Sequence, residues 1–293
     1  MAHSARRQFP DFHRKVYISW NLTENRFRDK GITVFLSKFN KLTVFSGYLC
    51  YLRAVRSLRK SGCDTVIEMQ DVWKTYPDGT HAIRGINLKV DRNEFVYVVG
   101  PSGAGKSTFM KMIYREEKPT KGQIFVNGFN LAKLKPRKIP FLRRNIGVIF
   151  QDFRLLPKMT VSENIAFAME VIETPKKLIR KRTLEVLELV KLRDKADSLP
   201  TQLSGGEQQR VAIARAIVNS PSVIIADEPT GNLDPDTSWD IMKLMEEINY
   251  RGTTIIMATH NKEIVNSMRK RVIAVEKGLI ARDQARGDYG YED

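Results

Sequence analysis

A glycine-rich loop that contains a lysine is the part of this sequence whose residue types most clearly indicate chemistry. The loop follows the apolar run Phe95–Val99 and precedes a helical pattern, Lys106–Arg115. Glycines allow successive backbone N–H groups to turn toward phosphate oxygens, and the N-terminus of the next helix adds a partial positive charge. The loop therefore predicts a nucleotide site in which Lys106 contacts the β- and γ-phosphates and Ser107 binds Mg²⁺. Its residues are Gly100, Pro101, Ser102, Gly103, Ala104, Gly105, Lys106, Ser107 and Thr108.

Two carboxylates, Asp227 and Glu228, follow a second apolar run, Val223–Ala226. Ligands of open α/β sheets bind at the C-terminal ends of strands. We therefore predict that Asp227 holds Mg²⁺ through water and that Glu228 polarises the attacking water, an assistance typically worth about 10²–10⁴ in rate. Taken alone, the pair could equally cap the next helix; beside a phosphate loop it indicates ATP hydrolysis.

A second helix start also has the residue types of an anion site. Ser204 and two glycines precede the helical pattern Glu207–Asn219, and a helix N-terminus attracts anions. One chain thus has two phosphate-binding helix ends but one loop with a lysine.

The elements that must position these groups alternate between strand and helix. Apolar runs predict buried strands and amphipathic spacings predict helices, which together favour an α/β fold with a mainly parallel sheet. The predicted strands begin at Val66–Met69 and continue with Phe95–Val99, Val223–Ala226 and Thr253–Ala258. The predicted helices are Lys106–Arg115, Lys176–Leu192, Glu207–Asn219 and Asp236–Asn249.

The first 64 residues differ in character from the rest. Of the formal charge of +16, they carry +9, from 13 Lys/Arg against 4 Asp/Glu. Apolar residues between Phe35 and Val55 recur at helical spacing, so the segment could form an amphipathic helix on a membrane surface. It could equally be a poorly ordered tail, or upstream sequence translated from a mis-assigned start; we expect 1–64 to be an extension and 65–293 the folded domain.

Cysteine, histidine and hydropathy patterns exclude several other classes of protein. Cys50 and Cys63 fit reduced thiols, and the four histidines form no metal-binding pattern. The apolar stretch Leu42–Leu52 is shorter than the about 20 residues that a membrane span needs, and no secretory signal is visible. We expect a cytoplasmic protein.

One hexapeptide resembles the signature motif of ATP-binding-cassette (ABC) proteins. Its residues are Leu203, Ser204, Gly205, Gly206, Glu207 and Gln208. The resemblance implies a P-loop NTPase fold of the ABC nucleotide-binding type. This fold has a RecA-like core with a mainly parallel sheet, an antiparallel β part, and a helical subdomain at about 153–205 that contacts a membrane partner. It also implies an ATPase that works as a homodimer, in which the signature of one subunit closes on the ATP of the other.

The resemblance assigns roles to further residues. Tyr76 matches the aromatic that stacks on adenine, and Gln151 matches the glutamine that links the Mg²⁺ site to the transmembrane partner. Asp234 lies in the loop that crosses the dimer, and His260 matches the switch histidine. One departure is Asn261, where most members have aspartate; we expect little effect on hydrolysis, with a local contact weakened.

Longer strings are similar to the FtsE family of cell-division ATPases. They are Pro140–Leu156, Leu203–Ala216, Ala226–Asp234 and the ending Gly287–Asp293, which resembles Gram-positive members. The resemblance implies a membrane partner of the FtsX type, indirect control of peptidoglycan hydrolases, and a place on the cytoplasmic face of the membrane at the division site. Alternatives are the ATPase of a lipoprotein-releasing or macrolide-export transporter, or a nucleotide-gated scaffold. A nucleic-acid-binding cassette is disfavoured, because the chain has neither a second cassette nor a long insertion.

Overall fold

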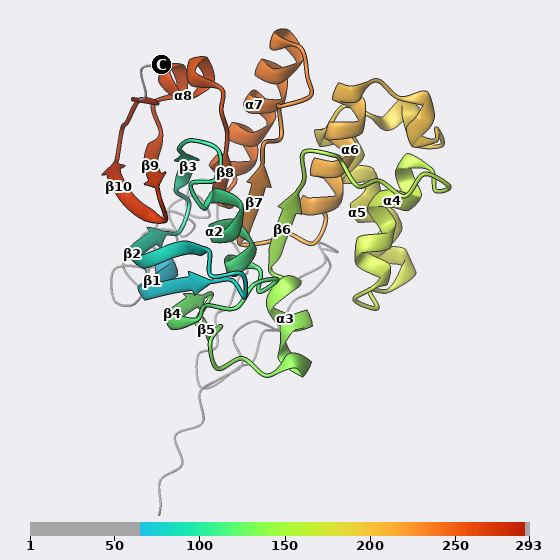
Figure 1. The fold of residues 1–293 in the computed structure, drawn as a ribbon. Helices are drawn as coiled ribbons and strands as arrows, with labels where there is room; N and C mark the ends of the chain where they lie inside the picture. Colours follow the sequence, from blue (N-terminus) through green and yellow to red (C-terminus); the bar gives the residue numbers. More distant parts are fainter. Residues whose placement is uncertain (1–64, 291–293) are drawn as a thin grey trace, which may run out of the picture. The chain divides into compact units, whose positions relative to one another are not determined.

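The computed structural model describes residues 65–290, which belong to one compact unit, Cys63–Asp293. The predictions made for residues 1–64, including the amphipathic helix and both cysteines, lie outside the described residues. Within 65–290, two sheets and a group of helices are assembled around the phosphate loop (Figure 1). No helix in this range is long and apolar enough to cross a membrane.

The larger sheet has six strands, five of them parallel. In spatial order they are β10 (Leu279–Gln284), β9 (Arg271–Glu276), β3 (Phe95–Val99), β8 (Thr254–Ala258), β7 (Val223–Asp227) and β6 (Ile146–Ile149). Only β10 is antiparallel to its neighbour. Every residue of β3 and β8 is buried, because side chains on both faces of a central parallel strand are covered. This explains their unbroken apolar runs.

The smaller sheet is antiparallel, with spatial order β2 (His81–Asp91), β1 (Thr65–Thr75), β4 (Lys121–Val126) and β5 (Phe129–Asn130). Its inner face shares a buried cluster with helix α2 (Lys106–Ile113) and with Val96 and Val98 of β3. The alternate β3 residues, Phe95, Tyr97 and Val99, belong to the cluster that contains the remaining helices. The parallel sheet thus separates two cores, and α2 is packed between the two sheets.

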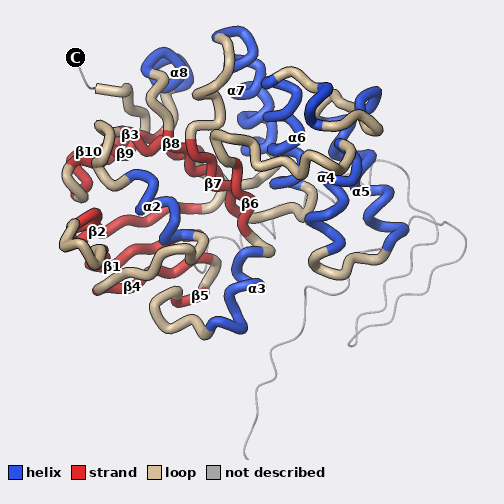
Figure 2. Tube along the Cα trace, turned by 45° about the vertical axis from the view of Figure 1, so that its right-hand side comes forward, coloured by secondary structure: helices blue, strands red, loops and turns tan. Residues whose placement is uncertain are grey.

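The helices that cover the other face follow in chain order. They are α3 (Ile139–Arg143), α4 (Val161–Glu170), α5 (Lys176–Leu189), α6 (Gly205–Ile217), α7 (Pro235–Tyr250) and α8 (Lys262–Met268), with short 3₁₀ turns at Pro136–Lys138, Arg193–Lys195 and Pro200–Gln202. Helices α4, α5 and α6 pack against one another. Figure 2 shows α4 and α5 grouped on one side, away from the antiparallel sheet.

A buried asparagine fixes the loop that leads into α4. The Asn164 side chain is fully buried and donates to the carbonyl oxygens of Leu156, Met159 and Thr160 at 3.1, 2.9 and 3.0 Å. Its own carbonyl accepts from Leu156 N at 2.8 Å. Because buried polar groups that are fully bonded rigidify their surroundings, the loop that follows β6 has a defined path into the helices.

The predicted strands are present, and the predicted helices need small corrections at their ends. The first strand is longer than predicted, through Thr75, and β8 starts at Thr254 rather than Thr253. Helix α2 ends at Ile113 because Arg115 has a left-handed φ of 60°. In the same way α5 stops at Leu189, ahead of Lys191 with φ 58°.

The remaining two boundaries shift by one or two residues. Helix α6 begins at Gly205, two residues earlier than predicted, because Ser204 caps it, and it ends at Ile217. Helix α7 is one residue longer at each end, Pro235–Tyr250, with Asp234 as its N-cap.

Candidate functional site

The phosphate loop connects β3 to α2 and has a backbone shape that requires glycine at two positions. Gly100 has φ 145° and Gly105 has φ 108°. A Cβ at Gly100 would clash with the Val275 carbonyl oxygen, and one at Gly105 with that of Ala82. Gly105 is the N-cap of α2, and no side chain bonds the first N–H groups of this helix. Such a helix start is suited to an anion.

Lys106 lies in this loop with its ammonium group turned onto the loop itself. It is 7% exposed, and Nζ donates to the carbonyl oxygens of Gly100 at 2.7 Å and Pro101 at 3.0 Å. Burial lowers the Lys106 pKa, and the nearby carboxylates Glu228 and Asp227 act in the opposite direction. The side chain is therefore a partly desolvated cation whose two present contacts a phosphate could replace.

The other residues predicted around the nucleotide lie beside this helix start. Ser107 is exposed at the first turn of α2. The Tyr76 hydroxyl is 3.2 Å from Oγ1 of Thr108, and Nζ of Lys74 lies 4.8 Å from the Tyr76 ring centroid. The aromatic ring is thus held next to the phosphate loop.

The two carboxylates extend from the end of β7 toward the same place. Burial raises the Asp227 pKa, the neighbouring Glu228 raises it further, and the cations Lys106 and Lys111 with His260 lower it. Glu228 has a left-handed φ of 49° and donates its N–H to the Ala258 carbonyl at 3.0 Å. Non-glycine residues with such φ values are uncommon and cluster at functional sites.

Glu228 and His260 form a direct pair. Nε2 of His260 is 2.7 Å from Oε1 of Glu228, and the two side chains are 48% and 24% exposed, respectively. A carboxylate that is half open to solvent and oriented by a histidine has the geometry of a general base that acts on water.

Gln151 follows β6 and contacts the loop after the carboxylates. Its Nε2 lies 3.1 Å from the position of a Cβ built on Gly231, and its carbonyl accepts from Asn232 Nδ2 at 3.1 Å. The next residue of that loop used here, Asp234, caps α7 by accepting from Thr237 N at 2.9 Å, which holds the Asp234 pKa below its usual value. The loops that carry Gln151, Glu228 and Asp234 are therefore adjacent.

The signature residues lie at the N-terminus of α6. Ser204 Oγ accepts from Glu207 N at 3.3 Å, and Ser204 N donates to Oε2 of Glu207 at 2.8 Å, a reciprocal capping box. A Cβ at Gly206 would clash with Cγ2 of Thr237 in α7. Within residues 65–290, no hydrogen bond or ion pair joins this helix tip to the phosphate loop.

The structure thus brings together most of the predicted site residues and leaves one group apart. The phosphate loop, Tyr76, Asp227, Glu228 and His260 surround one position, and Gln151 lies on the adjoining loop. Within residues 65–290 no three His, Cys, Asp or Glu side chains gather into a metal cluster. The donor set still fits Mg²⁺, which is usually held by one or two carboxylates together with substrate phosphates and waters.

Asn261, the departure from the family pattern, has a clear structural role. It is the N-cap of α8, and its Oδ1 accepts from Ile264 N at 2.9 Å. Asparagine and aspartate are similarly good N-caps, so the amide preserves this contact.

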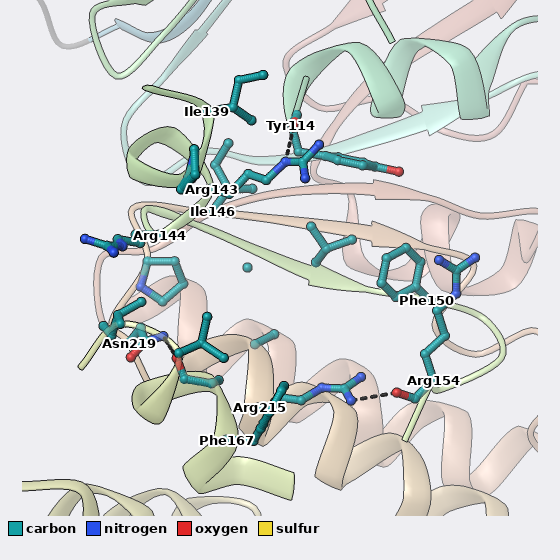
Figure 3. Close-up of a pocket in the computed structure, with 18 of the residues that line it drawn as sticks. Tyr114, Ile139, Arg143, Arg144, Ile146, Phe150, Arg154, Phe167, Arg215 and Asn219 are labelled. Atoms are coloured by element: carbon teal, nitrogen blue, oxygen red, sulfur yellow. Dashed lines mark hydrogen bonds between the residues drawn. The ribbon is translucent and has the colours of Figure 1, made fainter. Parts of the chain in front are cut away.

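A groove of about 700 Å³ between α3, β6 and α4 is a feature that the sequence did not predict. Its floor includes Ile146 and Val148, its α3 side Pro140 and Arg143, and its α4 side Phe167 (Figure 3). Phe141 beside it, Phe167 and Val171 are 47, 39 and 61% exposed. The apolar side chains come from three separate segments, so no single sequence window could indicate the groove.

Comparisons with known proteins agree with this geometry. The profile of the ABC transporter family matches residues 83–231. The chain is 67% identical to the cell division ATP-binding protein FtsE of Bacillus subtilis over 228 residues, which cover 78% of this chain and 100% of that protein. Against FtsE of Streptococcus pneumoniae D39 the identity is 61% over 229 residues, again 78% and 100%.

Solved structures give the same fold. The ATP-binding cassette MJ0796, described as a dimeric post-hydrolysis state bound to ADP and Pi, matches with a TM-score of 0.67 and 36% identity. The match covers 75% of this chain and 99% of that one. The α/β cassette fold and the resemblance to the FtsE family are both confirmed.

Proposed function

We propose a mechanical role for this chain, which belongs to the ABC transporter family of ATP-binding proteins and, within it, to the cell-division ATPases of the FtsE type. It is an ABC ATPase subunit of cell division. Beyond this, we propose that it forms a homodimer with two ATP molecules between the subunits. The ATP cycle then moves an FtsX-type membrane subunit and, through it, activates peptidoglycan hydrolases.

Hydrolysis in this proposal uses the groups gathered at the end of β7. Lys106 and the N–H groups of the phosphate loop bind the β- and γ-phosphates, and Tyr76 stacks on adenine. Ser107, Asp227 and Gln151 would hold Mg²⁺, which neutralises phosphate charge when bound. Glu228 takes a proton from water as the water oxygen attacks the γ-phosphorus and the bond to ADP breaks. His260, 2.7 Å from Glu228, orients that carboxylate and the γ-phosphate.

The observation that carries the dimer is that one chain has a single lysine-bearing loop and a single signature tip, with no described contact between them. The signature tip has its own cap, so it is preorganised without nucleotide. A second copy can bring its Ser204 tip to the γ-phosphate held by Lys106. The dimeric state named for the solved relative supports this arrangement. Loss of the γ-phosphate then removes the tie, a population shift with different contacts in each state.

The groove supports the proposal of a membrane partner. Exposed apolar side chains line it, and exposed apolar patches mark interaction sites. The segment at its edge, residues 131–144, has six basic residues and no acidic one. They are Lys133, Lys135, Arg137, Lys138, Arg143 and Arg144. Because none of these six forms a salt bridge with another described residue, we expect the docking segment to be apolar with carboxylates at its ends.

Co-purification tests this partner. Wild-type chain, expressed with its FtsX-type subunit, should purify with it from detergent-solubilised membranes. Charge reversal at the edge of the groove, Lys138→Glu with Arg144→Glu, should reduce recovery by about tenfold. The matched control, Lys176→Glu with Lys177→Glu at the exposed start of α5, should retain it. Equal recovery of both variants would show that the groove is not the docking site.

Glu228→Gln separates a mechanical cycle from a nucleotide-gated scaffold. The variant should bind Mg-ATP normally and hydrolyse it about 10²–10⁴-fold more slowly. In cells that depend on this chain, a mechanical role predicts filaments or misplaced septa. Normal division with Glu228→Gln would favour the scaffold, and drug or lipoprotein-transport defects without a division defect would favour an exporter. We further propose that the chain acts at the cytoplasmic face of the membrane at the division site.

A further inference from the structure

Arg215, in the last turn of α6, holds the loop that follows Gln151. Its Nη1 donates to the Arg154 carbonyl at 2.6 Å and its Nη2 to the Phe153 carbonyl at 2.9 Å. Figure 3 shows the bond to Arg154 at the end of the groove. Arginine suits this contact because its planar fork presents two donors in fixed geometry, whereas a lysine ammonium is a single compact donor group.

The two carbonyls belong to a strained turn. Phe153 and Arg154 have φ values of 58° and 47°, consecutive left-handed conformations in residues other than glycine. Each such residue costs about 1–3 kcal/mol and persists only where its surroundings fix it. The guanidinium therefore supports a loop shape that the local sequence does not favour.

Arg215 has no carboxylate partner to account for its burial. No salt bridge involves it within residues 65–290, and burial lowers its pKa. A buried cation that is bonded only to two backbone carbonyls stabilises those carbonyls rather than an ion pair. By contrast, the Arg154 side chain forms an ion pair with Asp152 at 3.2 Å and stacks 3.8 Å from the Phe150 ring centroid. Both flanks of Gln151 are thereby tied to the same turn.

The location of Arg215 connects two parts of the site. Helix α6 starts at the Ser204 tip and reaches Arg215 eleven residues later, about 16 Å along a rigid helix. Gln151 lies two residues before Phe153. The loop that approaches the chain's own nucleotide and the tip that approaches the nucleotide of the second copy are therefore attached to opposite ends of one helix.

We propose that Arg215 is a positioning residue that makes the Gln151 loop and the signature tip move as one body. The proposal rests on the roles given above to Gln151 and Ser204. Its mechanical consequence is that a partner segment that moves the groove wall at Arg154 also moves Ser204, since both are fixed to α6. Without Arg215, the turn at Phe153 relaxes and the Gln151 side chain loses its position.

The test compares arginine variants at the two arginine contacts of α6. Arg215→Lys keeps the charge and loses the fork; Arg215→Gln is a second, neutral variant. Arg182→Lys is the matched control, because Arg182 of α5 donates to the Val218 carbonyl at 3.3 Å, also at the end of α6, but does not contact the Gln151 loop. All variants are made in the full chain, in complex with its membrane subunit.

Steady-state ATPase assays and hydrogen exchange supply the measurements. We expect Arg215→Lys to lower kcat per bound ATP by about tenfold, with KM within about twofold. The backbone amides of residues 152–155 should exchange about tenfold faster, and ATP should no longer protect the amides of residues 204–208. Arg182→Lys should stay within about twofold in each measurement. Normalising to bound ATP prevents a loss of folded protein from imitating the effect.

Two results would overturn the proposal. One is a kcat per bound ATP for Arg215→Lys and Arg215→Gln that matches the control; the other is unchanged exchange at residues 152–155. Failure of the underlying function looks different, because wild-type chain would then show no hydrolysis that depends on Glu228 and no ATP-dependent protection at the signature tip.

Discussion

The N-termini of α2 and α6 are both phosphate-binding helix ends by residue type, yet the structure completes them in opposite ways. Gly105 caps α2 with a left-handed backbone and no side-chain bond, and Lys106 turns back onto the loop carbonyls. Ser204 caps α6 with a reciprocal bond to Glu207. The first end has unmet N–H donors and a desolvated cation, whereas the second meets its own donors.

This difference separates binding from closure. An end with unmet donors gains most from an anion and is suited to hold ATP in a single subunit. An end that is already capped keeps its shape without ligand and can add a hydroxyl donor and a helix dipole to phosphate that another subunit presents. Changes at α2 should therefore affect nucleotide binding, and changes at α6 should affect hydrolysis with binding intact.

The largest effect is expected at the α2 end. Lys106→Met should lower ATP affinity and reduce hydrolysis by about 10²–10³-fold, the cost of removing a preorganised charged donor. Nucleotide binding measured by fluorescence and phosphate release measured in the same sample provide the check. If Lys106→Met binds Mg-ATP as tightly as wild type, the assignment of α2 as the binding end is wrong.

At the α6 end, Gly206→Ala should reduce hydrolysis by about 10²-fold, the effect of misplacing a catalytic contact by about 1 Å. The added methyl would clash with Cγ2 of Thr237 and push α6 away from α7. Binding of ATP to the single subunit should be unchanged.

Thr237→Ser removes the clashing methyl and keeps the backbone N–H that bonds Asp234. In the double variant Gly206→Ala/Thr237→Ser, hydrolysis should therefore recover to within about tenfold of wild type. An inactive double variant with a normal melting curve would mean that the methyl interferes directly with the nucleotide.

A smaller effect concerns stability at the α2 end. Burial and Glu228 raise the Asp227 pKa, so the folded state binds more protons than the unfolded state between the two pKa values, and the stability contribution of Asp227 falls as pH rises through this range. Asp227→Asn should stabilise the nucleotide-free protein at neutral pH by about 0.5–2 kcal/mol, as changes at strained active sites often do, while ATPase activity is lost.

Thermal melting across pH checks this prediction. The gain in Tm from Asp227→Asn should be present at neutral pH and disappear as pH approaches the ordinary aspartate pKa of about 3.9. A variant that melts lower than wild type at neutral pH would show that the Asp227 charge is stabilising, which would contradict the sign worked out here.

The smallest effect is expected from Ser204→Ala, which removes the α6 cap. Such caps typically contribute about 1 kcal/mol, and in a domain of this size that corresponds to about 2–4 °C in Tm. No equivalent cap substitution exists at α2, since its cap is a glycine. Differential scanning fluorimetry of Ser204→Ala, with Ser204→Asp as the cap-preserving control, provides the measurement; equal Tm values would mean that the capping box is not stabilising.

The sequence predicted the central elements because their signals are local. The unbroken apolar runs of β3, β7 and β8 require only burial on both faces, and the glycines at positions 100 and 105 follow from backbone geometry. Boundaries were less accurate, because a single left-handed residue such as Arg115 or Lys191 ends a helix without changing its periodicity. Strands with mixed residues, such as β6 and β9, were not predicted at all.

The sequence by itself determined that this chain binds and hydrolyses ATP, because the phosphate loop and the carboxylates after β7 are contiguous in the chain. Only the tertiary structure decided what is distant in sequence: the pairing of His260 with Glu228, the groove between α3 and α4, and the grip of Arg215 on the Phe153 turn. The physical reason is that such contacts depend on the packing of separate elements. Residue type limits which bonds a side chain can form, but the path of the backbone selects the partner.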